Sequence, residues 1–81
     1  MIVTVLFFAQ ARERAGCASE ALDLPAGSRV ADALAAIERA RPALAPLWPH
    51  LAVAVNGVLV GQETVLAPGA ELALLPPVSG G

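Results

Sequence analysis

Residues 28–40 read SRVADALAAIERA, and this stretch decides the fold. Its apolar residues recur at helical spacing (Val30, Ala33, Leu34, Ile37), and its charged residues occupy the other side (Asp32, Glu38, Arg39). The pattern predicts an amphipathic helix with one buried face. Ser28 is the expected N-cap, because its hydroxyl can accept hydrogen bonds from free N–H groups of the first turn. Pro42 should end the helix near Ala40, since the residue before a proline is pushed out of the helical region.

Two strands are predicted before this helix. Residues 2–8 are rich in β-branched and aromatic side chains, which is typical of a strand. Alternation places Val3, Val5 and Phe7 on one face. The other face contains Thr4 and is therefore the less buried one, so Phe8 is predicted to point outward. After a polar connection that can hold a helical turn, residues 19–24 form the second strand, which stops at Pro-Ala-Gly, residues 25–27.

Three further strands are predicted after the helix. Residues 42–50 contain three prolines and are expected to form a stiff loop in which Trp48 covers one end of the core. Residues 51–55 and 58–60 flank Asn56-Gly57, a strong signal for a β-hairpin with a type I′ turn. Residues 71–75 form the last strand.

The last strand also has two distinct faces. Leu72 and Leu74 face one way, and Glu71 marks the opposite face as the outer one. Leu75 therefore joins Phe8 on the predicted outer surface.

The order of elements predicts an α+β fold. One helix that follows an initial hairpin can cover one face of a mixed sheet of about five strands, because helix and sheet each have one apolar face to bury. This is the layout of the β-grasp, or ubiquitin-like, fold. With 81 residues the chain has room for one domain. We expect it at residues 1–75, followed by a flexible C-terminal tail at residues 76–81.

Composition excludes several classes of function. Apolar residues make up 57% of the chain and charged residues 15%, so we expect some apolar surface to remain exposed. No apolar run reaches the ~18 residues of a membrane span, and the start has no basic region typical of a signal peptide, so we expect a cytoplasmic protein without membrane contact. The five basic residues are dispersed arginines and the net charge is −2, which disfavours nucleic acid as a partner.

Side-chain chemistry is sparse. The chain has one histidine, His50, one cysteine, Cys17, and no tyrosine, so we expect neither a metal site nor a set of catalytic side chains. It also has no lysine, which excludes joining its own end to a lysine on a second copy.

The unusual segment is the end, Pro76-Pro77-Val78-Ser79-Gly80-Gly81. Six residues at ~3.3 Å each can extend about 20 Å. The two prolines fix φ and stiffen the base, and the two glycines have no Cβ and can enter a narrow slot. Gly-Gly alone is also compatible with a frayed terminus. A terminal carboxylate is ionised at neutral pH and is a poor electrophile, so chemistry there needs an activating partner that uses ATP.

Three segments together resemble a known family: VLFFAQARE at residues 5–13, AVNG at 54–57 and LPPVSGG at 75–81. They are similar to the small subunit of molybdopterin synthase, the MoaD type of ubiquitin-like sulfur carrier. The resemblance implies adenylation of the C-terminus by a ubiquitin-activating-like, MoeB-type adenylyltransferase, followed by formation of a thiocarboxylate. It also implies a heterotetramer with a MoaE-type large subunit, which receives the tail and supplies the catalytic side chains.

The same resemblance assigns roles to individual residues. Gly81 bears the sulfur, which passes to cyclic pyranopterin monophosphate, and Gly80 gives the tail flexibility. Phe8, Leu59 and Leu75 form an apolar docking patch; alternation predicts the outward position of Phe8 and Leu75, whereas Leu59 rests on the resemblance. Residues 76–79 of the tail are also expected to contact the partner. No permanently bound cofactor is implied, and ATP is used by the activating enzyme.

Two features depart from the family pattern, and other functions stay open. Leu74-Leu75 stands where an aromatic pair is common, and Ala70 replaces a frequent acidic residue. A sulfur carrier for thiamine synthesis or tRNA thiolation would share the fold and the Gly-Gly end. A ubiquitin-like protein modifier is an alternative of a different class.

Overall fold

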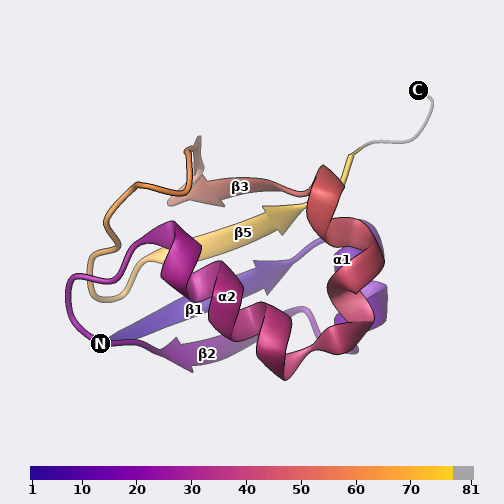
Figure 1. The fold of residues 1–81 in the computed structure, drawn as a ribbon, viewed down its shortest axis with the longest axis horizontal. Helices are drawn as coiled ribbons and strands as arrows, with labels where there is room; N and C mark the ends of the chain where they lie inside the picture. The colour runs from indigo at the N-terminus through magenta and orange to yellow at the C-terminus, as the bar shows by residue number, and fades with distance from the viewer. Residues whose placement is uncertain (78–81) are drawn as a thin grey trace.

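The computed structural model describes residues 1–77, so the predictions for Val78, Ser79, Gly80 and Gly81 lie outside the described residues. The elements follow in the order β1 (Ile2–Phe7), α1 (Ala9–Ala15), β2 (Ser19–Asp23), α2 (Val30–Ala40), the 3-10 helix η1 (Pro42–His50), β3 (Ala52–Val55), β4 (Val58–Leu59) and β5 (Glu71–Leu75). Figure 1 shows α2 lying across one face of the sheet, with α1 and η1 near one end of it.

The sheet is mixed, as predicted. Its strand order is β2-β1-β5-β3-β4. The central strands β1 and β5 run parallel, and every other neighbouring pair is antiparallel. A parallel pair needs a crossover, and residues 8–70 supply it, with α2 packed on the sheet. The arrangement is the predicted β-grasp fold.

Alternation in the two central strands fills the core. Val3, Val5 and Phe7 of β1 and Leu72 and Leu74 of β5 are all buried. The facing stripe of α2 is buried too, at Val30, Ala33 and Ile37. Because each element hides one apolar face against another, the predicted inward set of each strand is confirmed.

The prediction that Ser28 caps the helix is wrong. Its hydroxyl donates to the Pro25 carbonyl at 2.7 Å, which closes the turn before the helix, and Ser28 itself is buried. The helix begins one residue later, with Arg29 as N-cap. There the Asp32 carboxylate accepts from the Arg29 backbone N–H at 2.8 Å, and an acid in the first turn also suits the helix dipole.

Residues 42–50 form a 3-10 helix, where a loop was predicted. Proline fixes φ at a value that a helical turn can use, and the short i to i+3 bonds of a 3-10 helix tolerate missing N–H donors better than a long α-helix does. Trp48 is half-buried and packs against the core, as expected. The polar connection after β1 likewise holds a two-turn helix, α1, which ends at Gly16 with φ of 78°.

The hairpin between β3 and β4 is confirmed. Asn56 and Gly57 have φ of 49° and 84°, the left-handed region that a type I′ turn requires. The Asn56 side-chain oxygen also accepts from the backbone N–H of Glu71 at 2.9 Å. The turn is therefore tied to β5, which fixes where β4 and Leu59 lie.

Arg41, between α2 and η1, joins four parts of the chain. Its guanidinium donates to both carboxylate oxygens of Glu20 at 2.6 and 3.2 Å and to the Ala15 carbonyl at 2.7 Å. It also lies 5.2 Å from the ring centroid of Phe7, a cation–π distance. The hydrogen bond to Glu20 raises the pKa of Arg41 above its ordinary value, although desolvation acts against this. The guanidinium therefore stays charged at any pH at which the protein is handled.

We predict that Arg41→Ala lowers the free energy of unfolding by about 1–2 kcal/mol, because it leaves Glu20 and a carbonyl without their donor. The expected loss of stability is small because about a quarter of each side chain of the ion pair is exposed, and solvent screens their interaction. Arg39→Ala on the exposed face of α2 is the matched control and should change stability by less than about 0.5 kcal/mol. Urea unfolding measures both, and equal midpoints for the two variants would contradict the role given to Arg41.

Candidate functional site

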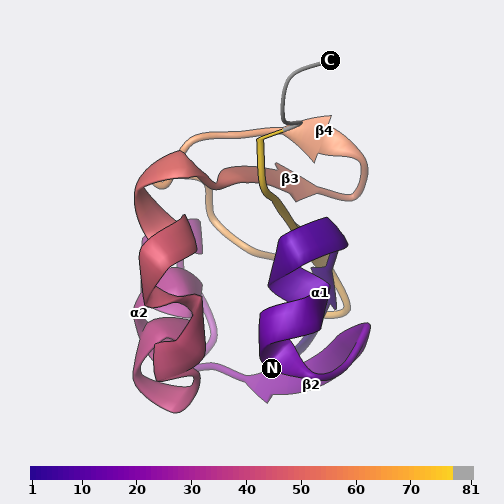
Figure 2. The same ribbon diagram turned by 90° about the vertical axis from the view of Figure 1, so that its right-hand side faces the viewer.

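The face of the sheet opposite α2 has no other part of residues 1–77 packed across it (Figure 2). The strand register places Leu6, Ala73, Ala54 and Leu59 in one row on this face, since each is paired with the next. All four are apolar: Leu59 is 69% exposed, Leu6 and Ala73 are half-buried, and Ala54 is buried, with 6% exposed. A sheet face with exposed apolar side chains is a candidate interaction surface.

Three predicted docking residues gather on this face where β1 and β5 end. Phe8 follows Phe7, which is paired with Leu74, so Phe8 and Leu75 continue the same register. On the other side of β5, Leu75 is paired with Ala52 of β3. Two residues further along β3, Ala54 is paired with Leu59 of β4. Phe8 is 46% exposed and Leu59 69%, whereas Leu75 is half-buried. We call Phe8, Leu59 and Leu75 the outer-face patch.

The tail begins beside this patch. Pro76 is half-buried and Pro77 exposed, directly after the end of β5. The rest of the predicted carrier segment, residues 78–81, lies outside the described residues. The structure thus brings the base of the tail and the outer-face patch to the same edge of the sheet.

Sequence reasoning missed the small residues between the large ones. Ala52, Ala54 and Ala73 lie among the members of the patch on the outer face. Their signal was available, because strict alternation along residues 51–55 puts both alanines of β3 opposite Val53. Together they make a shallow floor between larger apolar side chains.

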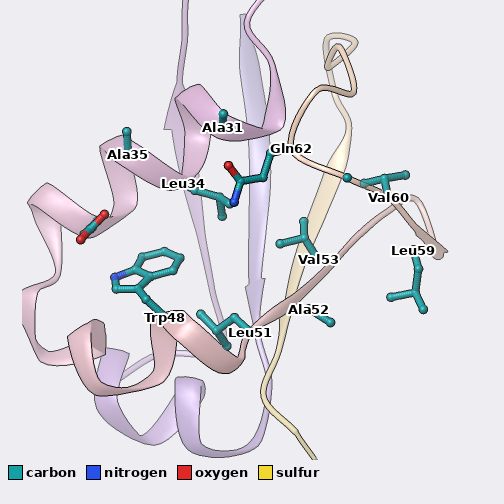
Figure 3. A pocket seen from close by; sticks show the side chains of 12 residues that line it. Ala31, Leu34, Ala35, Trp48, Leu51, Ala52, Val53, Leu59, Val60 and Gln62 are labelled. Carbon is teal, nitrogen blue, oxygen red and sulfur yellow. The ribbon is translucent and has the colours of Figure 1, made fainter.

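A second hollow, which the sequence did not predict, lies on the α2 side of the sheet. It is a groove of about 490 Å³ between α2 and the β3–β4 edge, running from Ala31 and Leu34 across Trp48 and Val53 to Val60 (Figure 3). Glu38 is the one charged residue in its lining. We call this hollow the helix-side groove.

The Trp48 indole ring forms one wall of the helix-side groove (Figure 3). Its indole Nε1–H is buried and has no hydrogen-bond partner among the described residues. A buried donor without a partner costs about 1–3 kcal/mol relative to one that is satisfied.

Within residues 1–77, titratable side chains do not converge. No group of three or more His, Cys, Asp or Glu residues that could hold a metal ion occurs there. His50 is exposed, and the Cys17 thiol lies 3.5 Å from the Arg41 guanidinium. None of the helices in this part of the chain is long and apolar enough to cross a membrane.

Comparison with known proteins agrees with this geometry. The molybdopterin synthase sulfur carrier subunit of Escherichia coli is 43% identical over 82 residues, with 99% of this chain and 100% of that protein covered. The crystal structure of the small archaeal modifier protein 1, SAMP1, from Haloferax volcanii has a TM-score of 0.91 at 35% identity and covers both chains fully.

A third match is a chain in the complex of subunits 1 and 2 of the molybdopterin-converting factor from Helicobacter pylori. It has a TM-score of 0.76 at 29% identity, again with both chains fully covered. Residues 5–81 match the ThiS family. This chain therefore belongs to the ThiS family.

Proposed function

We propose that this chain is the sulfur carrier subunit of molybdopterin synthase and that its working group is the carboxyl group of Gly81. The observation that carries the proposal is the position of the outer-face patch at the edge of the sheet where β5 ends and Pro76 begins. A partner bound to that patch lies where the tail starts. The similarity to the Escherichia coli carrier subunit supports the same function.

The chemistry of the tail requires activation and then exchange of one atom. The Gly81 carboxylate attacks the α-phosphorus of ATP and pyrophosphate leaves, which gives an acyl-adenylate. A sulfide-level donor then attacks the carbonyl carbon and AMP leaves, so that sulfur replaces one oxygen. The resulting thiocarboxylate is a soft nucleophile, as thiolates are, and can attack where a carboxylate reacts slowly.

Two partners are needed for this sequence of steps. An adenylyltransferase of the ubiquitin-activating type uses the ATP, and a large catalytic subunit receives the sulfur for cyclic pyranopterin monophosphate. The matched Helicobacter pylori chain was solved in complex with a second subunit, which supports an assembly of the same kind here. We infer that both partners bind the outer-face patch. Because they use the same surface, they bind this chain one after the other.

The division of labour follows from the residues present. Within residues 1–77 no metal-binding cluster is found, and the chain has no lysine and no tyrosine. The groups that activate cyclic pyranopterin monophosphate therefore come from the large subunit. This chain contributes the tail, its stiff Pro76-Pro77 base and the docking patch.

A second candidate is a protein modifier, favoured by the high similarity to SAMP1. In that function the activated Gly81 carbonyl would be attacked by a lysine of a target protein, and AMP would leave. A sulfur carrier for thiamine synthesis or tRNA thiolation shares the activation steps and differs in the acceptor.

We predict that incubation with ATP, a sulfide source and an active adenylyltransferase from a molybdopterin pathway raises the intact mass of the chain by the difference between one sulfur and one oxygen atom. The reason is that the adenylate is displaced by sulfur at Gly81 only. Intact-mass spectrometry gives the readout, and omission of ATP is the control. An unchanged mass with an enzyme that loads its own carrier would rule out sulfur transfer by this chain.

We also predict that deletion of Gly81 abolishes molybdopterin formation in a mixture reconstituted with the large subunit, because the carbonyl that carries the sulfur would then lie one residue short of the catalytic groups. Circular dichroism should be unchanged, because the deletion leaves residues 1–77, which form the described fold, intact. Conjugates with other proteins, formed by the full chain without molybdopterin, would instead support the modifier function.

The outer-face patch is tested with Leu59→Ser. Leu59 is 69% exposed, so stability should change little, whereas the complex with the large subunit should weaken about tenfold or more, as for an apolar residue at the centre of an interface. Val65→Ser is the matched control, because Val65 is 56% exposed and pairs with Arg29 outside the patch. Isothermal titration calorimetry measures both, and similar affinities for the two variants would exclude the patch as the docking surface.

A further inference from the structure

The helix-side groove adjoins the outer-face patch. Leu59 and Ala52 belong to the lining of the groove and also to the outer face of the sheet. Figure 3 shows both residues at the β3–β4 side of the groove, opposite Ala31 and Ala35 of α2. A protein that covers Leu59 from the outer face therefore reaches the mouth of the groove around the short edge strand β4.

The lining defines the chemistry of an occupant. The walls are mostly aliphatic, with small side chains on α2 at Ala31 and Ala35, and the Gln62 amide projects into the hollow beside Leu34 (Figure 3). Glu38 lies exposed at the rim and no basic residue lines the groove, so a cation is the complementary neighbour. The Trp48 indole ring forms one wall of the groove, and its Nε1 lies on the side of the ring away from the hollow (Figure 3).

We propose that the helix-side groove binds a peptide segment of the large catalytic subunit. The segment carries an apolar side chain, which enters between Leu34 and Val53, and an adjacent lysine or arginine, which pairs with Glu38. This inference rests on the proposed function, because continuity with the outer-face patch selects the partner.

The sole tryptophan of the chain makes occupation of the groove directly measurable. Uniform ¹⁵N labelling gives one indole N–H resonance, and an unlabelled partner adds none. The probe is the large subunit of molybdopterin synthase from Escherichia coli, whose carrier is a relative of this chain. On formation of the complex we expect this resonance to shift, because the segment packs against the indole ring that lines the groove.

Two variants test the chemistry of the groove by calorimetry. Glu38→Arg should weaken the complex about tenfold at low ionic strength, and the loss should shrink as salt is added. Glu63→Arg makes the same charge change at an exposed residue outside the lining and should weaken binding less than about twofold. Ala31→Gln, which fills the groove from the exposed side of α2, should also weaken binding without loss of stability.

The outcomes separate this inference from the proposed function. If Leu59→Ser weakens the complex but Glu38→Arg and Ala31→Gln bind like the wild type, the groove is not part of the interface and the proposed function stands. An indole resonance that does not move on complex formation overturns the groove inference in the same way. If the unaltered chain does not bind the large subunit at all, both proposals fail.

Discussion

The parallel pairing of β1 with β5 is the contact on which the rest of the structure depends. It joins residues 4–7 to residues 71–74, near the two ends of the chain, in the middle of the sheet. Because the strands are parallel, both of their carboxyl ends reach the same edge. Phe8 and Pro76 are therefore neighbours by topology, and the outer-face patch and the base of the tail come together for that reason.

The same pairing divides the apolar residues between two tasks. In each strand one alternate set is buried under α2, and the other set lies on the uncovered face. On that face the set is still apolar at Leu6, Ala73 and Leu75. An exposed apolar face lowers solubility and adds no stability to the folded chain. Its apolar composition is therefore typical of a surface that a partner covers. The high apolar content of the sequence is in this way divided between the core and the uncovered face of the sheet.

The sequence predicted the parts of the fold that depend on local pattern. Alternation at Val3, Val5 and Phe7, helical spacing in residues 30–37 and the Asn56-Gly57 turn each reflect a backbone geometry, and each was confirmed. The N-cap and η1 could not be predicted in this way. The Ser28 hydroxyl can either cap the helix or bond to the preceding turn, and in the structure it donates to the Pro25 carbonyl. The prolines of residues 42–50 are compatible with either a loop or a 3-10 helix, and packing of Trp48 and Leu47 against the core favours the helix.

The candidate site shows the same difference between features that follow from local pattern and features that depend on the tertiary arrangement. Exposure of Phe8 follows from alternation, but the nearness of Phe8 to Leu59 depends on the strand order, which no local pattern contains. The helix-side groove depends on still more distant relations, because it exists only where small residues of α2 face the short strand β4. Leu59 of the two-residue strand β4 pairs with Ala54 on the outer face and also lines the groove on the α2 side.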